Sequence, residues 1–327
     1  MTQTVLLQVL VLSAMMLLGF ILGKRGYLKK EGVDLLTKLM MDVFLPCNVL
    51  AAASGDFSTG NLVQTAGIIL LYYFFMLSFT ALAAGVARLL RLSRDDMLVL
   101  SRSVGYPNNG FMGLPLCESV FGPQGTVLTF LSFPASSLYI TFNLVWSFRR
   151  ESGNNTVKHA KDIWNPMNLS VIAMLVMIAT GWKLSEPLLQ FCDSFGRCVT
   201  PVAMLVIGFV LSNKPLSDAF CRPVLYLFTA LRSLICPLLA AFVMRFTSLD
   251  RNICLCMVMV LGCSAASLVS IFASQYDRSP ALAGEEMLQS TLLLPLTMPL
   301  LMAISERILW SQMQPFRHGT MYCEAER

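Results

Sequence analysis

The stretch GYPNNGFMGLP, residues 105–115, lies in the middle of a long apolar run and decides the fold. Its two prolines, three glycines and two asparagines do not suit a regular lipid-facing helix, because freed backbone groups in hydrocarbon cost several kcal/mol unless satisfied. The stretch therefore lines a cavity or is buried in protein. A helix broken here presents a half-helix N-terminus, whose free N–H groups favour an anion. We therefore predict substrate contacts at Pro107, Asn108, Asn109 and Gly110; the alternative is a proline-kinked helix whose asparagines satisfy its own backbone.

The whole chain is too apolar for an ordinary globular domain. Of its 327 residues, 56% are hydrophobic and 13% are charged, against roughly 25% charged in a typical soluble domain; the mean hydropathy is +0.66. This composition indicates an integral membrane protein in a lipid bilayer, and it excludes a soluble metabolic enzyme, a nucleic-acid-binding domain and a disordered regulator. The net charge of +5 needs no nucleic acid, since such an excess is typical of cytoplasmic loops. The cysteines act as small hydrophobes, because no CxxC pair occurs.

Clusters of charge, glycine and proline divide the chain into apolar spans of about the 20 residues that a bilayer requires. Ten spans are predicted, at 3–23, 33–54, 62–87, 96–120, 125–148, 166–183, 190–213, 219–245, 252–275 and 281–308. We predict an all-α membrane protein with a first five-helix repeat over 1–148, a cytoplasmic linker over 149–165, a second, inverted repeat over 166–311 and a C-terminal tail over 312–327.

The distribution of basic residues predicts the orientation. Four of them follow the first span at once, which argues against a cleaved signal peptide: Lys24, Arg25, Lys29 and Lys30. Further basic residues occupy 88–94 and 149–161, whereas the loops 55–61 and 121–124 have none. The positive-inside rule therefore places both termini outside a multi-pass protein of the cell (plasma) membrane.

Two segments of the chain match at a constant offset of 157 residues. LSRDDMLVLSRSVGYP (92–107) aligns with LDRNICLCMVMVLGCS (249–264), so that Gly105 corresponds to Gly262 and Pro107 to Ser264. Five spans per half give the two halves opposite orientations, as in many transporters. The broken segment of the fourth span therefore has a counterpart in the ninth span, and this counterpart begins at Gly262.

The corresponding segment of the ninth span, GCSAASLVS (262–270), has small and hydroxyl residues but no proline. Ser264 and Ser267 are predicted to offer hydroxyls to a substrate, or else to bond to carbonyls one turn earlier.

Ionisable residues inside the spans are functional hypotheses by default. Asp42 is predicted to bind a coupling cation, to carry a proton or to pair with Arg102. Arg102 either neutralises a bound carboxylate or extends to the cytoplasmic interface. For Arg232 a structural pairing is favoured over ligand contact, and Asn48 is a further candidate for lining the cavity.

Several chemistries lack their residues. No GxxxxGK[ST] motif occurs, so ATP is not the predicted energy source. Both histidines, His159 and His318, lie outside the spans, so an intramembrane Ser/His hydrolase and a His-ligated metalloprotease lack their base or ligands. We predict no enzyme, no metal and no cofactor.

The chain resembles the auxin efflux carrier family over nearly its whole length. The matching features are LLGFILGKRGYL (17–28), VFLP (43–46), NNGFMGLPL (108–116) with Phe121 and Gly122, Asn165 with Pro166, PVAMLVIG (201–208) and FASQY (272–276). The resemblance implies ten helices in two inverted repeats, as in bile-acid symporters, with broken fourth and ninth helices that cross at the substrate site. It also implies organic anions as substrates, such as auxin, malate or malonate, and a possible homodimer. The chain departs from the family's pattern at Ser264, where a second crossover proline is usual, and at Asp42, where an uncharged residue is expected.

The predicted function is secondary active or facilitative transport of a small organic anion by alternating access. Its carboxylate would meet Asn108 and Asn109, with Arg102 adding positive charge, and the candidate coupling ions are a proton and a sodium ion. Two alternatives stay open: a sodium-coupled carrier like the bile-acid symporters, and a membrane receptor that binds a ligand without moving it.

Overall fold

A computed structural model of the chain describes residues 2–54, 62–148, 166–213 and 218–310. Within these ranges the secondary structure is helical, and β-structure is limited to an isolated bridge between Pro107 and Ala265. The predicted linker over 149–165, the predicted tail beyond 311 and the loop 55–61 lie outside the described residues, and so do the two histidines.

The helices of the first half follow the predicted spans. They are α1 (Thr2–Lys24), α2 (Lys30–Leu39), α3 (Leu45–Ala53), α4 (Leu62–Leu89), α5 (Arg94–Gly105), α6 (Leu114–Phe130) and α7 (Ser132–Tyr139). Those of the second half are α9 (Pro166–Thr180), α10 (Glu186–Gly196), α11 (Val199–Ser212), α12 (Asp218–Cys221), α13 (Pro223–Ala230), α14 (Cys236–Met244), α15 (Arg251–Leu261), α16 (Ser267–Gln275) and α17 (Pro280–Trp310).

Four short π-helical segments join some of these helices into longer rods. They are η1 (Met40–Phe44), η2 (Asn109–Gly113), η3 (Ile140–Val145) and η4 (Leu231–Ile235). Three of them end two residues before a proline, namely Pro46, Pro115 and Pro237. A proline inside a helix has no N–H to donate and its ring clashes with the carbonyl four residues earlier. A local widening of the turn relieves that clash, and such π-bulges are often found at functional sites.

Seven helical runs among the described residues are long and apolar enough to cross a membrane. They are Gln3–Lys24, Lys30–Ala53, Val63–Leu89, Asn109–Phe148, Glu186–Ser212, Pro223–Met244 and Pro280–Leu309. The run Asn109–Phe148 has 40 residues, about twice what one crossing needs. It turns at Gly122, whose φ of 63° lies in the left-handed region that glycine adopts without strain. A multi-pass membrane protein is thus confirmed, while the ten-helix inverted repeat stays a prediction.

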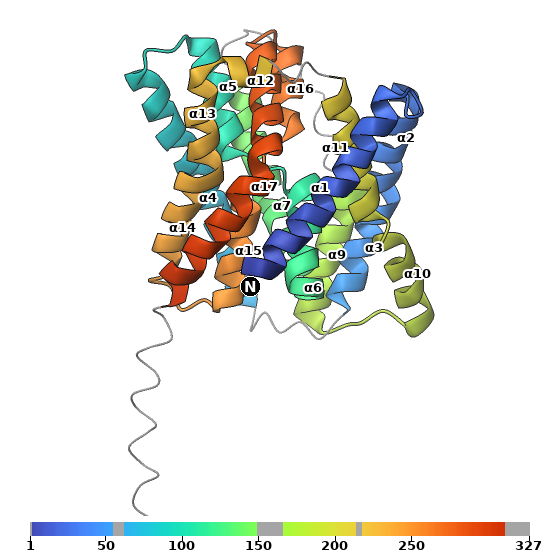
Figure 1. Cartoon of the computed structure of the whole chain (residues 1–327). Helices are drawn as coiled ribbons and strands as arrows, with labels where there is room; N and C mark the ends of the chain where they lie inside the picture. Colours follow the sequence, from blue (N-terminus) through green and yellow to red (C-terminus); the bar gives the residue numbers. More distant parts are fainter. Residues whose placement is uncertain (1, 55–61, 149–165, 214–217, 311–327) are drawn as a thin grey trace, which may run out of the picture.

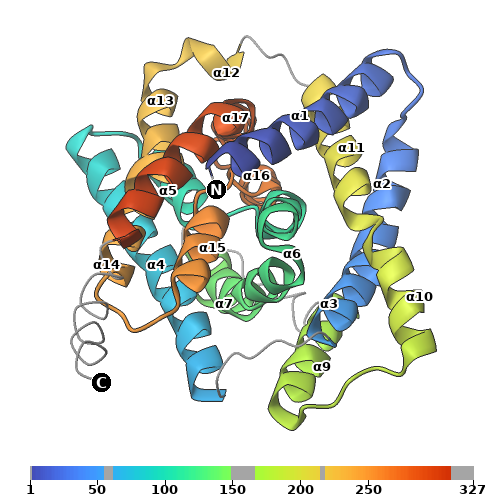
Figure 2. The same cartoon turned by 60° about the horizontal axis from the view of Figure 1, so that its bottom comes forward.

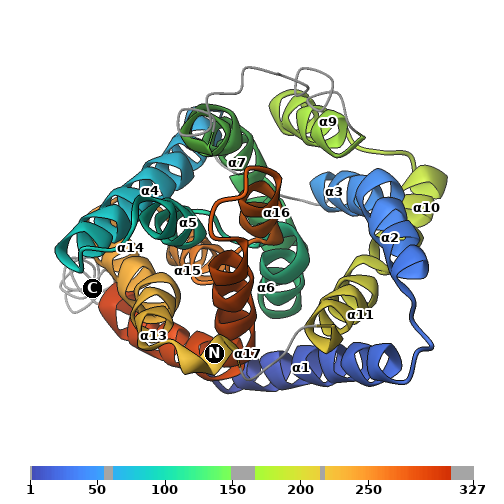
Figure 3. The same cartoon turned by 90° about the horizontal axis from the view of Figure 1, so that it is seen from above.

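The helices form two groups side by side when the molecule is seen from above (Figure 3). We call α1–α3 with α9–α11 the scaffold bundle, and α4–α7 with α13–α17 the crossover bundle. Each bundle takes helices from both predicted repeats, and Figure 2 shows the same division from the opposite end. The bundles meet where α1 contacts α17 and where α3 contacts α6.

The scaffold bundle contains an unusually close helix contact between α1 and α11. A side chain at Gly19 would collide with the Leu205 carbonyl oxygen, and one at Gly208 with the Met16 carbonyl oxygen. The two backbones therefore touch directly, as small residues allow in membrane helices.

The core of the crossover bundle is α15, which is buried on every side from Ile253 to Leu261. A helix that is apolar all round is expected to be buried in this way. Cys254 and Cys256 lie here as free thiols within the apolar packing, in agreement with their predicted role as small hydrophobes.

Candidate functional site

The predicted break in the fourth span is present. Helix α5 ends at Gly105, the chain is extended at Tyr106 (φ −111°, ψ 105°), and helical structure resumes at Asn109. Gly105 is required by its surroundings, because a Cβ there would collide with the Thr80 hydroxyl and come within 2.7 Å of the Tyr139 hydroxyl. Those two hydroxyls share a hydrogen bond of 2.6 Å.

The predicted break in the ninth span is also present, and it crosses the first one. Helix α15 ends at Leu261 and α16 begins at Ser267. The Asn108 N–H donates to the Ser264 carbonyl over 3.0 Å, and the Ala266 N–H donates to the Tyr106 carbonyl over 3.4 Å. The two breaks thus pair as a minimal antiparallel ladder, which satisfies backbone groups that would otherwise be exposed in hydrocarbon.

A cleft of about 570 Å³ lies between the two bundles and reaches this crossing. Asn108 and Phe111 line it from the first break, and Ser267 and Ile271 line it from α16. The remaining lining residues come from the other helices around it: Lys30, Val33, Asp34 and Thr37 of α2, residues 206, 207, 209–211 and 213 in and just after α11, and Met287 and Thr291 of α17. Because Lys30 and Asn213 stand at helix ends, the cleft opens at the end of the molecule where α2 begins, at the top of Figure 1.

The opposite side of the crossing is closed by apolar packing. Val9, Leu12 and Met16 of α1 face Met112, Leu116, Met204 and Leu294 there. The space between them is about 10 Å³, at the lower limit of what one water molecule needs. The contrast with the cleft of about 570 Å³ indicates that the described conformation is open on the side where α2 begins.

The crossover residues predicted to bind substrate do not all face the cleft. Asn108 and Ser267 line it. Asn109 is buried, and its amide nitrogen donates to Ser132 Oγ over 2.7 Å and to Ser136 Oγ over 2.9 Å. Asn109 thereby fixes the break against α7 instead of presenting its amide to the cleft.

The other predicted binding residues contribute backbone or packing. Ser264 is fully buried and accepts hydrogen bonds through its carbonyl, while Pro107 forms the bridge to Ala265. Gly110 faces the ring of Phe133, which a Cβ would approach to 3.6 Å. Asn48 is buried in the scaffold bundle, where its amide donates to the Gly196 carbonyl over 3.1 Å.

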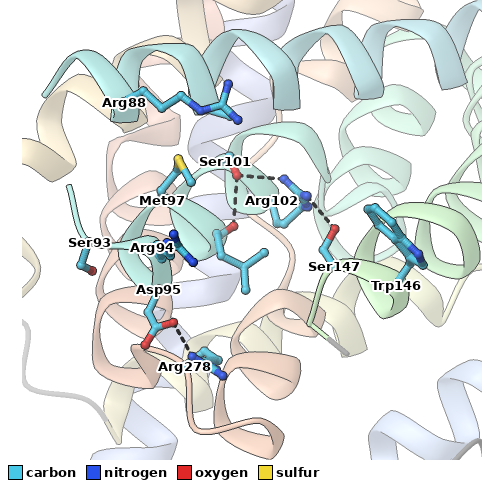
Figure 4. A pocket seen from close by; sticks show the side chains of 12 residues that line it. Arg88, Ser93, Arg94, Asp95, Met97, Ser101, Arg102, Trp146, Ser147 and Arg278 are labelled. Carbon is cyan, nitrogen blue, oxygen red and sulfur yellow. Dashed lines mark hydrogen bonds and ion pairs between the residues drawn. The ribbon is translucent and has the colours of Figure 1, made fainter. Parts of the chain in front are cut away.

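Arg102 lines a second cavity, of about 780 Å³, near the end of the molecule where α5 begins (Figure 4). Its Nη2 donates to Ser147 Oγ over 2.6 Å and its Nη1 to Ser101 Oγ over 3.0 Å. Three more arginines line this cavity, namely Arg88, Arg94 and Arg278, the last of which pairs with Asp95 over 2.7 Å. The position favours the interpretation in which Arg102 extends to the membrane interface.

Asp42 is exposed on the scaffold bundle, whereas Arg102 belongs to the crossover bundle, so the structure does not bring the two together. The acidic residue that lines the cleft is Asp34, two turns earlier on the same rod.

The sequence indicated one of the two buried charges near the crossing and not the other. Glu286 on α17 was not singled out, although an ionisable residue inside the apolar span 281–308 is the signal that marks such sites. Arg232 was expected to pair structurally, and it donates to the carbonyls of Ser103, Val104 and Ser264 at the crossing.

Comparisons with known proteins indicate a membrane transporter. A family model described as a membrane transport protein matches residues 4–160 and 151–302 of the chain. A protein of Methanothermobacter thermautotrophicus, described as an uncharacterized transporter, is 26% identical over 310 residues, which cover 91% of this chain and 96% of that protein.

Proposed function

The chain belongs to the membrane transport protein family, and from this premise we propose that it is a secondary transporter of a small organic anion. The family match and the relative described as a transporter support a transporter that is not an enzyme. The proposed substrate is a carboxylate or dicarboxylate of the size of malate or malonate, or an auxin-like acid. The transport step is active or facilitative and works by alternating access.

The observation that carries this proposal is the pair of uncapped helix starts at the end of the cleft. The N-cap residue of η2 is Asn108 and that of α16 is Ala266, and neither makes a side-chain capping hydrogen bond. First-turn N–H groups need partners, and a carboxylate is the ligand that the positive end of a helix dipole favours. A carboxylate at the crossing meets two such ends at once.

The side chains around the cleft fit the same ligand. The amide of Asn108 and the hydroxyl of Ser267 can donate to carboxylate oxygens, while Lys30 near the mouth attracts anions. Arg102 lines the other cavity, so the proposal gives it no direct contact with substrate.

The positive-inside rule assigns the open end of the cleft to the cytoplasm, because Lys24, Arg25, Lys29 and Lys30 surround the start of α2. The described conformation then faces inward, with the termini outside the cell membrane. Alternating access follows if the crossover bundle moves against the scaffold bundle, which closes the cleft and opens the methionine-lined contact on the other side.

The test is uptake of radiolabelled mono- and dicarboxylates into proteoliposomes. Replacing Asn108 with Leu removes one charge-assisted hydrogen bond, so we expect at least about a tenfold loss of kcat/KM for uptake. Asn252→Leu is the matched control and should transport normally. Asn252 is exposed and lies at the start of α15, whereas the crossing follows the other end of that helix.

Two results would contradict the proposal. Normal uptake by Asn108→Leu would remove the crossing from the substrate site. Saturable binding of an acid without flux by the wild-type protein would identify a receptor.

A further inference from the structure

A cluster of buried polar side chains contacts the crossing without lining the cleft. Its centre is Arg232 of η4, which is 1% exposed. Its guanidinium donates to the carbonyls of Ser103 (2.9 Å) and Val104 (2.6 Å), near the end of α5, and to the Ser264 carbonyl (3.1 Å) beyond the end of α15. The C-terminal ends of two half-helices, both negative ends of helix dipoles, therefore converge on one positive charge.

Glu286 of α17 is the counter-charge of Arg232, and the hydroxyl of Ser103 is its polar neighbour. Its side chain is 0% exposed, and its carboxylate lies close enough to the Arg232 guanidinium for the two charges to attract each other. Neither of its carboxylate oxygens accepts a hydrogen bond of standard geometry from the residues that the structure describes. An ionised carboxylate in that state is strongly destabilised, so the site favours a proton or a small cation on Glu286.

Three further buried hydroxyls belong to the segments that meet at the crossing. Ser103 lies next to the Glu286 carboxyl, to which its hydroxyl can donate. The Oγ atoms of Ser233 and Ser264 are buried and make no hydrogen bond of standard geometry within the described part of the chain. Ser290, one turn after Glu286, accepts from the Ala265 N–H over 3.1 Å, which fixes this turn of α17 against the second break. The cluster is thus a set of oxygen atoms arranged around the crossing.

The charges facing the cluster favour a proton over a metal cation. The charged group that acts on Glu286 is Arg232 of η4. Three titratable groups also face Arg232, namely the thiols of Cys236 and Cys263 and the phenol of Tyr139. Arg222 pairs with Glu285 over 3.0 Å. A sodium ion on Glu286 would stand beside the fixed positive charge of Arg232. A proton converts the carboxylate into a neutral group that can donate to a hydroxyl oxygen.

We propose that Glu286 carries a proton that is co-transported with the anion, and that Arg232 takes the place of a coupling metal cation at the crossing. The inference rests on the proposed function. With Glu286 ionised the pair is neutral, whereas protonation of a carboxylate oxygen leaves the charge of Arg232 uncompensated. That charge attracts an anion to the cleft, which is lined by Met287, the next residue of α17 after Glu286. By linkage, a bound anion favours the proton to the same extent, and both leave together on the other side.

The experiment compares wild-type protein with Glu286→Gln and with Glu285→Gln in proteoliposomes, with radiolabelled malonate as the probe and the membrane potential clamped at zero. Exchange of external for internal malonate measures substrate movement without a gradient. Accumulation under an inward proton gradient measures coupling. For one proton per anion, a gradient of one pH unit supports an accumulation of about tenfold.

Gln is a neutral mimic of the protonated carboxyl, so Glu286→Gln should retain exchange and lose all gradient-driven accumulation. Glu285→Gln, at the neighbouring and partly exposed position, should behave as wild type. Glu286→Asp keeps a group that accepts a proton and should retain accumulation, which separates loss of coupling from loss of folding. Wild-type accumulation by Glu286→Gln, or accumulation driven by a sodium gradient alone, would overturn the proposal.

Infrared difference spectra between acidic and alkaline buffer supply a readout that needs no substrate. We expect a carboxyl band that disappears in Glu286→Gln and persists in Glu285→Gln. If wild-type protein exchanges no acid, the proposed function fails and so does the coupling, while this band still decides whether Glu286 takes up a proton. Absence of the band would overturn that assignment as well.

Discussion

The two breaks at the crossing correspond in position, yet different interactions produce them. In the first, Pro107 and the asparagines interrupt the helix locally. In the second no proline is present, and the extended conformation is held from outside: Ser290 accepts from the Ala265 N–H, while Arg232 and the Asn108 N–H donate to the Ser264 carbonyl. The first break is therefore encoded in its own sequence, whereas the second depends on its tertiary partners.

The largest expected effect comes from removing the residue that both breaks share. Arg232→Met deletes the hydrogen bonds to three carbonyls and leaves Glu286 buried without its counter-charge. We expect the free energy of unfolding in detergent to fall by about 3–5 kcal/mol. Arg222→Met is the control, since it breaks an ion pair in which the arginine is 52% exposed and should cost less than about 1 kcal/mol. Equal losses in the two variants would contradict the role of Arg232.

Substitutions at the two aligned glycines, Gly105 and Gly262, are expected to have the next largest effects on stability and to differ between the two breaks. An added Cβ at Gly105 meets the Thr80 and Tyr139 hydroxyls and a backbone carbonyl, so Gly105→Ala should lower the free energy of unfolding by about 1–3 kcal/mol. At Gly262 the first atom met is a terminal methyl of Leu301, which can rotate away. Gly262→Ala should therefore cost about 1 kcal/mol or less, as measured by the same denaturation. A reversed order would show that the two sites are not packed as described.

A last pair of substitutions tests whether each break is produced by its own sequence or by its tertiary contacts. Ser290→Ala leaves the buried Ala265 N–H without its acceptor and should cost about 1–2 kcal/mol. Pro107→Ala mainly increases the entropy of the unfolded chain and should cost about 0.5 kcal/mol, because Asn108 still pairs with Ser264. Thermal unfolding of both variants decides the order. A greater loss for Pro107→Ala would mean that the crossing depends on the proline.

The sequence predicted the apolar helices well because a bilayer imposes a length and a composition on each span. It also located the first break, since Pro107 and Asn108 conflict with a helix in their own right. The second break was expected only from the family resemblance, while the offset of 157 residues located the segment that corresponds to the first break. Nothing within Gly262 to Ser267 forbids a continuous helix as strongly as a proline does.

The side chains at the site were harder to predict. Asn108 and Asn109 are adjacent, and periodicity does not determine which of them faces the cleft once the helix is broken. The structure turns Asn108 to the cleft and ties Asn109 to Ser132 and Ser136. Glu286 and Arg232 meet only because α17 packs against η4, a contact that spacing along the chain does not reveal.

The direct backbone contact between Gly19 and Leu205 and between Gly208 and Met16 has a mechanical consequence. Two helices that touch without intervening side chains cannot slide past each other, because their backbones would collide at once. The pair α1 and α11 therefore forms a rigid frame within the scaffold bundle. In the proposed alternating access, the displacement would then fall at the contacts between the two bundles, such as those of α1 with α17 and α6 and of α3 with α6.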